Sequence, residues 1–192
     1  MEGLVVKSTG SWYEVTTAKG AHYRCRIRGK LRIAGIKVTN PVAVGDIVAL
    51  SPENDHEAII EKILPRRNYL IRRSIRKKAH GHILAANIDQ AVLVATLTFP
   101  RTSMGFIDRF LVAAESFRIP SLLVFNKSDM WDDEMQRTVK DLEPVYTDIG
   151  VKFLTMSATR GINLELFRDH LKNKISLIAG HSGVGKSTIL NA

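Results

Sequence analysis

The sequence predicts an all-β barrel of the oligonucleotide-binding (OB) fold followed by an α/β domain, a parallel sheet with helices on both faces. Three observations predict this fold class. Short strand-like segments fill residues 1–64, apolar runs alternate with helical stretches over residues 88–192, and the excess positive charge lies before residue 89. With 192 residues and 45% hydrophobic content, the chain is long enough to bury a core in one or two domains.

Residues 1–64 are expected to form a small barrel, because β-type segments follow one another with turn signals between them. These segments are "GLVVK", "SWYEVTT", "AHYRCRIRG", "VGDIVAL" and "EAIIEKIL". Closure into a barrel removes the exposed edges that an open sheet would leave. An OB barrel is the most economical choice, although strand counting alone does not separate it from an SH3-like barrel.

Residues 65–87 are expected to be a basic linker, since "PRRNYLIRRSIRKKAHGHILAAN" lacks sustained alternation and is too basic for a core element. The first 88 residues hold 16 of the 28 Lys and Arg but only 7 of the 19 Asp and Glu. This asymmetry favours a polyanion as the partner of the first part. The RNA-binding candidates are Arg24, Arg26, Arg28, Arg66, Arg67, Arg72, Arg73, Arg76, Lys77 and Lys78.

A solvated surface is the alternative interpretation of these charges. For Trp12, Tyr13 and Tyr23, packing in the barrel core is favoured over stacking on unpaired bases. The single cysteine, Cys25, cannot form an internal disulfide and is expected to be a small, partly buried apolar residue. The six histidines are scattered, so no zinc-ligand cluster is predicted, and His82 is expected in a loop.

Residues 88–192 show the alternation of strands and helices that requires a parallel sheet. The apolar runs are "AVLVATL", "SLLVF", "VKFLTMSA" and "ISLIAG". Between them lie the helical stretches "FIDRFLVAAESF", "DEMQRTVKDLEPVY" and "NLELFRDHL". Loops at the carboxyl ends of such strands are where α/β sheets bind ligands.

The strand "ISLIA" leads into "GHSGVGKS", which matches the phosphate-loop pattern at all four specified positions. Glycines allow successive N–H groups to point at a β-phosphate. Lys186 is expected to reach the β- and γ-phosphates, and the Ser187 hydroxyl to bind Mg²⁺. The candidate phosphate-binding residues are Gly180, His181, Ser182, Gly183, Val184, Gly185, Lys186, Ser187 and Thr188.

Two further loops predict which base is bound. "NKSD" follows the strand "SLLVF", and a carboxylate at Asp129 can accept from the guanine N1–H and amino group together, whereas adenine has no N1–H. Alone, this tetrapeptide is equally compatible with a helix-capping turn. "MSATRG" follows "VKFLT" and would offer backbone N–H groups to guanine O6, or form an ordinary turn. The candidates are Asn126, Lys127, Ser128, Asp129, Ser157 and Ala158.

The order of these motifs differs from that of an ordinary GTPase, in which the phosphate loop comes first. Here "NKSD" and "SAT" precede "GHSGVGKS", which indicates a circular permutation. Together with the small basic barrel and the phrase "AANIDQAVLV", this order resembles the RsgA family, the circularly permuted, ribosome small-subunit-dependent GTPases. The resemblance covers the whole chain.

The resemblance implies a GTP-dependent role in late maturation of the small (30S) ribosomal subunit, with hydrolysis stimulated by the subunit. It implies that Asn126 to Asp129 bind guanine and Gly180 to Thr188 bind phosphate. Family members continue past the phosphate loop into switch segments, a DxxG motif and a C-terminal zinc module. No DxxG occurs in this sequence, so we expect a piece of a longer protein that alone hydrolyses GTP poorly, with the water-orienting residue beyond Ala192.

The expected ligands are GTP or GDP with Mg²⁺, zinc being confined to the family's C-terminal module, and the expected partners are the small ribosomal subunit and its rRNA. We expect a cytoplasmic monomer without membrane attachment, because no run approaches about 18 apolar residues and "MEGLVVKSTG" carries an early acid. Two alternatives stay open. One is an RNA-binding module with GTP or GDP as a conformational ligand; the other is an ATP-using phosphate-loop enzyme, which "NKSD" disfavours.

Overall fold

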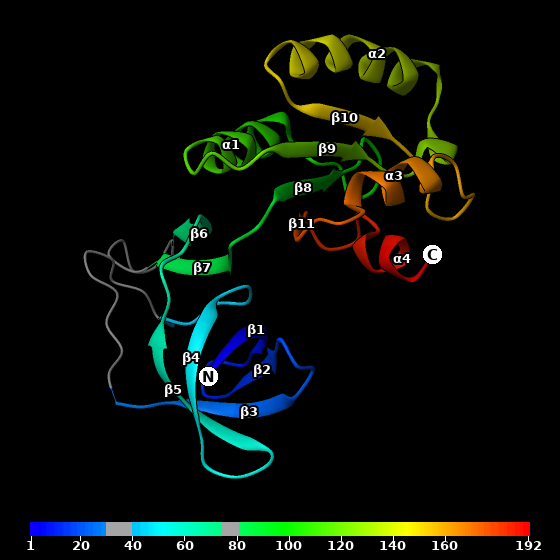
Figure 1. Cartoon of the computed structure of the whole chain (residues 1–192). Helices are drawn as coiled ribbons and strands as arrows, with labels where there is room; N and C mark the ends of the chain where they lie inside the picture. Colours follow the sequence, from blue (N-terminus) through cyan, green and yellow to red (C-terminus); the bar gives the residue numbers. More distant parts are fainter. Residues whose placement is uncertain (30–39, 74–80) are drawn as a thin grey trace. The chain divides into compact units, whose positions relative to one another are not determined.

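The computed structural model describes residues 1–29, 40–73 and 81–192 (Figure 1). The chain divides into two compact units, Met1–Asn87 and Ile88–Ala192. Each unit has its own hydrophobic core, formed by one cluster in the first unit and by two clusters in the second. Among the described helices, none combines the length and apolar character needed to cross a membrane.

Five strands of the first unit close into a barrel. They are β1 (Glu2–Ser8), β2 (Tyr13–Thr17), β3 (His22–Ile27), β4 (Ile47–Pro52) and β5 (Glu57–Ile63), and all five predicted segments are confirmed as strands. The order around the barrel is β1-β2-β3-β5-β4, with β1 pairing β4 to close it and β3 running parallel to β5. Together with the five-strand count, this order makes the barrel OB-like.

The barrel core follows the alternation of the strands. Val5, Val15 and Ile60 are fully buried, as are Tyr13 and Cys25. Burial also raises the pKa of the Cys25 thiol to about 11, so this cysteine behaves as a small apolar residue. The expectation of core packing is confirmed for Tyr13.

Residues 65–87, expected as a linker, contain a two-stranded antiparallel sheet of β6 (Tyr69–Arg73) and β7 (Gly81–Ala86). The segment is also tied to the barrel, because the Arg66 guanidinium donates two hydrogen bonds, of 2.6 and 2.7 Å, to the fully buried Asp46 carboxylate. Its Nη2 donates a third to the Pro41 carbonyl at 2.7 Å. A buried carboxylate requires a paired cation, so this part of the basic segment is structural.

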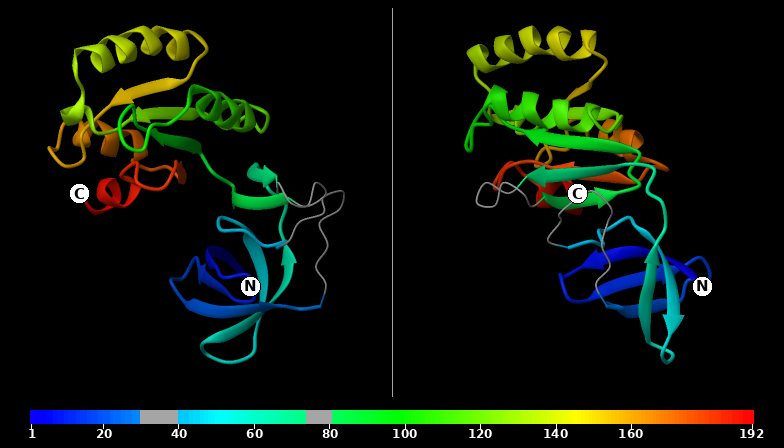
Figure 2. Two further views of the ribbon diagram at one scale, coloured as in Figure 1. Left: turned by 180° about the vertical axis from the view of Figure 1, so that it is seen from behind. Right: turned by 90° about the vertical axis from the view of Figure 1, so that its left-hand side faces the viewer.

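The second unit is a four-stranded parallel sheet of order β10-β9-β8-β11 with helices on both faces (Figures 1 and 2). The strands are β8 (Gln90–Ala95), β9 (Ser121–Phe125), β10 (Lys152–Thr155) and β11 (Ser176–Ala179). The helices are α1 (Met104–Glu115), α2 (Asp133–Asp148), α3 (Leu164–Leu171) and α4 (Lys186–Asn191), with the short 3₁₀ turn η1 (Ser128–Met130).

The central strand β8 is buried throughout, which explains its continuous apolar run. Val92 and Val94 pack in the cluster that includes α3 and α4, while Leu93 and Ala95 pack in the cluster that includes α1 and α2. The chain winds from β8 to β9 and β10, and then returns to place β11 on the other side of β8. The strand order therefore reverses between β8 and β11, where doubly wound sheets bind ligands.

Candidate nucleotide site

The three predicted ligand loops lie at one edge of the sheet. The "NKSD" loop follows β9, the "SAT" loop follows β10, and the phosphate loop follows β11. Because all four strands are parallel, their carboxyl ends meet at the same edge. The fold thus brings together segments that are up to about 60 residues apart in the sequence.

The phosphate loop takes a conformation that only glycine accommodates easily. Gly180, Gly183 and Gly185 have φ values of +148°, +83° and +100°, in the region that side chains disfavour. A Cβ atom on Gly180 would lie 2.4 Å from the Val94 carbonyl oxygen, and one on Gly185 would lie 2.3 Å from Asn126 Nδ2. The loop therefore packs against its neighbours more closely than other residues would permit.

Lys186 points back across the phosphate loop. Its Nζ donates to the carbonyl oxygens of Gly180 at 2.9 Å and His181 at 2.6 Å. These carbonyls hold the ammonium at the loop, where a bound phosphate would compete for it. The His181 ring packs on Phe106 of α1, with ring centroids 4.1 Å apart, which fixes the first turn of the loop.

Asn126 joins all three ligand loops. Its side chain is 2% exposed; Nδ2 donates to the Val184 carbonyl at 2.9 Å, and Oδ1 accepts from the Ala158 N–H at 3.1 Å. The Asn126 backbone N–H donates to the Ala95 carbonyl at the end of β8. A single amide therefore sets the spacing between the "NKSD", "SAT" and phosphate loops.

Asp129 is exposed and is oriented by the "SAT" loop. Ser157 Oγ donates to Asp129 Oδ1 at 2.5 Å, and Ser157 itself is fully buried. This hydrogen bond is the main reason why the pKa of the Asp129 carboxyl lies below its ordinary value. The carboxylate is thus held charged and in one orientation. Both properties are needed if it is to accept hydrogen bonds from the N1–H and the amino group of a guanine.

The "SAT" loop departs from its expected role. The Ser157 N–H donates to the Ile162 carbonyl at 3.1 Å, and the Ala158 N–H donates to Asn126. Both N–H groups expected to face guanine O6 therefore have protein acceptors in this structure, because a β-bridge between Ser157 and Ile162 closes the loop. In this structure the loop hydrogen-bonds to the side chains of Asp129 and Asn126 and so orients both.

A fourth loop, missed by sequence reasoning, also reaches this edge. It follows β8 and contains Phe99, whose carbonyl oxygen accepts from Lys127 Nζ at 2.6 Å. Lys127 has a left-handed backbone with φ +65°, a conformation that is uncommon for residues other than glycine. The only sequence signal was position, since "TLTFPRTS" follows its strand in the way that the other three loops follow theirs.

The donor set fits a Mg²⁺–nucleotide complex. Ser187 is exposed in the first turn of α4, directly after Lys186, and Mg²⁺ bound with phosphates takes few protein ligands. Ser187 would hold the ion together with phosphate oxygens and water. Within the described residues, no group of three His, Cys, Asp or Glu side chains forms a separate metal site.

The RNA-binding candidates fall into different environments. Arg24, Arg26 and Arg28 are exposed and alternate with Tyr23, Cys25 and Ile27, which face inward. The Arg24 guanidinium carbon lies 4.0 Å from the centre of the Trp12 ring. Arg26 and Arg28 form exposed ion pairs with Glu53 and Glu61, at 3.4 and 3.0 Å.

The basic residues of segment 65–87 also lie in different environments. Arg66 is buried against Asp46, and the Arg67 Nη2 donates to the Asn87 carbonyl at 3.0 Å. Arg72 and Arg73 belong to β6, whereas Arg76, Lys77 and Lys78 lie outside the described residues. Trp12, which we expected in the core, is instead half-buried beneath Arg24.

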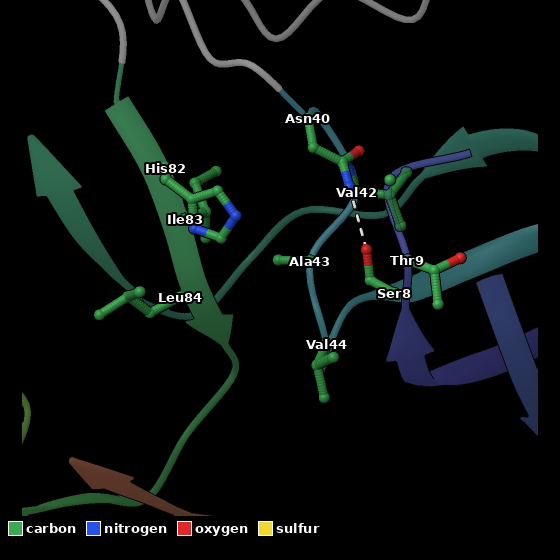
Figure 3. A pocket seen from close by; sticks show the side chains of 10 residues that line it. Ser8, Thr9, Asn40, Val42, Ala43, Val44, His82, Ile83 and Leu84 are labelled. Carbon is green, nitrogen blue, oxygen red and sulfur yellow. Dashed lines mark hydrogen bonds between the residues drawn. The ribbon is translucent and has the colours of Figure 1, made fainter. Parts of the chain in front are cut away.

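A cavity of about 580 Å³ lies in the first unit, between the end of β1, residues 40–44 and β7 (Figure 3). Asn40 Nδ2 donates to Ser8 Oγ at 3.0 Å on one side, and His82 lies on the opposite side. His82 thus belongs to β7 and not to a loop. The described lining contains no Lys, Arg, Asp or Glu, which makes it a poor match for nucleotide phosphates.

Comparison with known proteins agrees with both units. The model of the RsgA N-terminal domain matches residues 2–60, and the model of the RsgA GTPase matches residues 63–192. A curated relative from Cytophaga hutchinsonii, named small ribosomal subunit biogenesis GTPase RsgA, is 48% identical over 193 residues, and one of the same name from Bacteroides fragilis is 47% identical over 192. The matches cover the whole of this chain but 63% and 62% of the relatives' lengths.

Two solved structures share the fold over nearly the whole chain. YjeQ from Thermotoga maritima superposes with a TM-score of 0.77 at 36% identity, covering 99% of this chain and 63% of that one. YloQ, described as a circularly permuted GTPase, superposes with a TM-score of 0.69 at 32% identity, covering 100% of this chain and 63% of that one.

Proposed function

Because the chain belongs to the RsgA GTPase family, we propose that it binds and hydrolyses GTP in late maturation of the small (30S) ribosomal subunit, which stimulates the hydrolysis. The observation that carries this proposal is the Asn126 junction. One buried amide joins the "NKSD", "SAT" and phosphate loops through hydrogen bonds. The loops that would bind the base and those that would bind the phosphates are therefore held at a fixed spacing, as binding of one nucleotide requires.

The proposed role of each group follows from its chemistry. Asp129 accepts two hydrogen bonds from guanine, Lys127 lies along the base, and the phosphate loop surrounds the phosphates. Lys186 is the proposed catalytic residue, because its ammonium stabilises the charge that develops as water attacks the γ-phosphate. Ser187 would hold Mg²⁺, which supplies further neutralisation of phosphate charge.

Guanine specificity tests the site directly. We expect GDP to displace a fluorescent GDP analogue far better than ADP does, and Asp129→Asn to shift the preference toward xanthosine diphosphate. The reason is that an amide at this position complements the carbonyl that replaces the guanine amino group. Equal competition by ADP would overturn the hypothesis that the site is specific for guanine, and it would favour an ATP-using enzyme.

We propose that turnover by this chain alone is slow. Phosphate-loop NTPases hold Mg²⁺ with a further Asp as well as the loop Ser or Thr, and this sequence contains no DxxG motif. Phosphate release should be measured with and without small subunits. Fast turnover without subunits would contradict the proposal, whereas the absence of any stimulation in a longer family protein would favour an RNA-binding module that uses GTP or GDP only as a conformational ligand.

The proposed partner of the barrel is ribosomal RNA, bound by a cytoplasmic monomer. Arg24 is exposed and lies over the Trp12 ring, which holds its guanidinium at the barrel surface as a charge for phosphate. Arg24→Ala should weaken binding of a single-stranded RNA oligonucleotide and reduce the slope of log affinity against log salt by about 1. Lys152→Ala, which removes an equal charge from the second unit, is the matched control.

A further inference from the structure

The loop after β8, residues 96–103, lies between the two halves of the nucleotide site. In the sheet, β8 is flanked by β9, which carries the base-reading loop, and by β11, which carries the phosphate loop. Loops that leave the same edge of a sheet keep the order of their strands. The β8 loop is therefore placed at the level of the ribose, which connects base to phosphates in any nucleotide bound there.

The loop is held in one conformation by its own hydrogen bonds. The Thr96 N–H donates to Thr102 Oγ1 at 3.1 Å, and the Thr102 N–H donates back to the Thr96 carbonyl at 2.9 Å. Thr96 Oγ1 donates to the Pro100 carbonyl at 2.5 Å. Both threonines are fully buried, so the two ends of the segment 97–101 are held in place by the core of the unit.

The tip contacts both neighbouring loops. The Phe99 carbonyl accepts from Lys127 Nζ at 2.6 Å, on the base side. On the phosphate side, a Cβ atom on Gly183 would lie 3.2 Å from Pro100 Cδ, which shows that Pro100 packs directly on the phosphate loop. Residues 99 and 100 therefore bridge the segments that are proposed to hold guanine and phosphate.

The Phe99 side chain is 87% exposed, although Leu97 and Thr98 beside it are buried. The exposed ring leaves its apolar surface in water, and a ligand that covered it would gain the free energy of burying that surface, about 25 cal/mol per Å². We propose that Phe99 is a nucleotide-binding residue, whose ring packs on the ribose and base of the bound guanine nucleotide. The inference rests on the proposed function, because it takes the ligand to be a nucleotide in these loops.

The chemistry of the ligand supports this contact. A purine and the carbon face of a ribose are the apolar parts of a nucleotide, and an aromatic ring stacks on them without regard to hydrogen-bonding pattern. Phe99 would therefore strengthen binding of the nucleoside half, while Asp129 selects the base. Truncation to alanine should weaken GDP binding about ten-fold, in the range measured for stacking of one base.

The experiment measures how well unlabelled GDP displaces a fluorescent GDP analogue from the full chain. The variants compared are Phe99→Ala, Phe99→Trp and Val112→Ala. Val112 is also exposed, at 66%, but it lines a separate pocket together with Ile149 and Val151. Pyrophosphate is used as a second competitor, because it engages the phosphate loop without a nucleoside.

We expect Phe99→Ala to weaken GDP about ten-fold and leave pyrophosphate unchanged, with binding restored by Phe99→Trp and unaffected by Val112→Ala. Unchanged GDP affinity in Phe99→Ala would overturn the inference. Equal weakening of GDP and pyrophosphate would also overturn it, because it would show a collapsed loop. If the wild-type chain does not prefer GDP over ADP, the proposed function fails. If the wild-type chain prefers GDP and Phe99→Ala leaves the affinity for GDP unchanged, only the role of Phe99 fails.

Discussion

Gly185 shows how closely the phosphate loop and the base-reading loop approach each other. A Cβ atom there would lie 2.3 Å from Asn126 Nδ2, at a residue with φ +100°. We expect Gly185→Ala to lower GDP affinity more than about ten-fold and to destabilise the chain by about 1–3 kcal/mol, because it adds both a clash and backbone strain.

Gly150→Ala is the matched control for Gly185→Ala. Its φ is +82°, but no atom lies within 4 Å of the added Cβ position. The control should therefore lose stability from strain alone and keep its affinity for GDP. Thermal unfolding and GDP titration of both variants check this. Similar GDP affinity in the two variants would contradict the idea that the close approach of Gly185 to Asn126 is needed for GDP binding.

Asp129 carries a pH dependence whose sign follows from its hydrogen bond. The folded protein holds its pKa below the ordinary value, chiefly through Ser157. Its contribution to stability is thus present above the unfolded pKa of about 3.9 and is lost as the pH falls through the lower folded value. We expect Ser157→Ala to raise the pKa of Asp129 toward the ordinary value, which an NMR titration of the carboxyl group measures.

At the scale of elements, the Asp46–Arg66 pair fastens the segment before β6 to the barrel. Removing Arg66 leaves a fully buried carboxylate without its cation, so Arg66→Ala should destabilise the chain by about 3–5 kcal/mol. Arg28→Ala is the control, because its partner Glu61 is exposed and such pairs contribute about 0–1 kcal/mol. Similar unfolding temperatures for the two variants would contradict this assignment.

The elements with a strong periodic pattern were predicted correctly from the sequence. All five barrel strands and the strands and helices of the second unit are found, since alternation and apolar runs report burial locally. The β6–β7 pair was missed because its basic residues mask the pattern. Arg66 counts as a surface charge in a sequence, whereas its burial depends on Asp46, which lies 20 residues earlier.

The same limit applies to the candidate site. Local motifs predicted the phosphate loop and "NKSD", because each requires specific residues at fixed spacing. The role of Asn126 as a junction with Val184, and the presence of Phe99 beside Lys127, depend on which strands are neighbours. Strand order is a property of the sheet and is not encoded at any single position.

At the scale of the whole molecule, the two units have separate proposed tasks. Every contact described for the nucleotide site joins residues of the second unit, Ile88–Ala192. We therefore expect residues 88–192 alone to bind GDP within about three-fold of the full chain, a difference below about 1 kcal/mol. A GDP titration of this fragment, after its folding is checked by circular dichroism, tests the expectation, and loss of binding by a folded fragment would refute it.

The parallel sheet also separates the ligand loops from the turns that lead into the strands. Gly150 lies in such a turn, between α2 and β10, and has open space around it. The nucleotide loops all leave the opposite, carboxyl ends of the strands. In engineering terms, the turn at Gly150 is an attachment point, because a fluorescent domain inserted there would leave the carboxyl ends of the strands free. If the proposed function holds, such a fusion would be a sensor for guanine nucleotides.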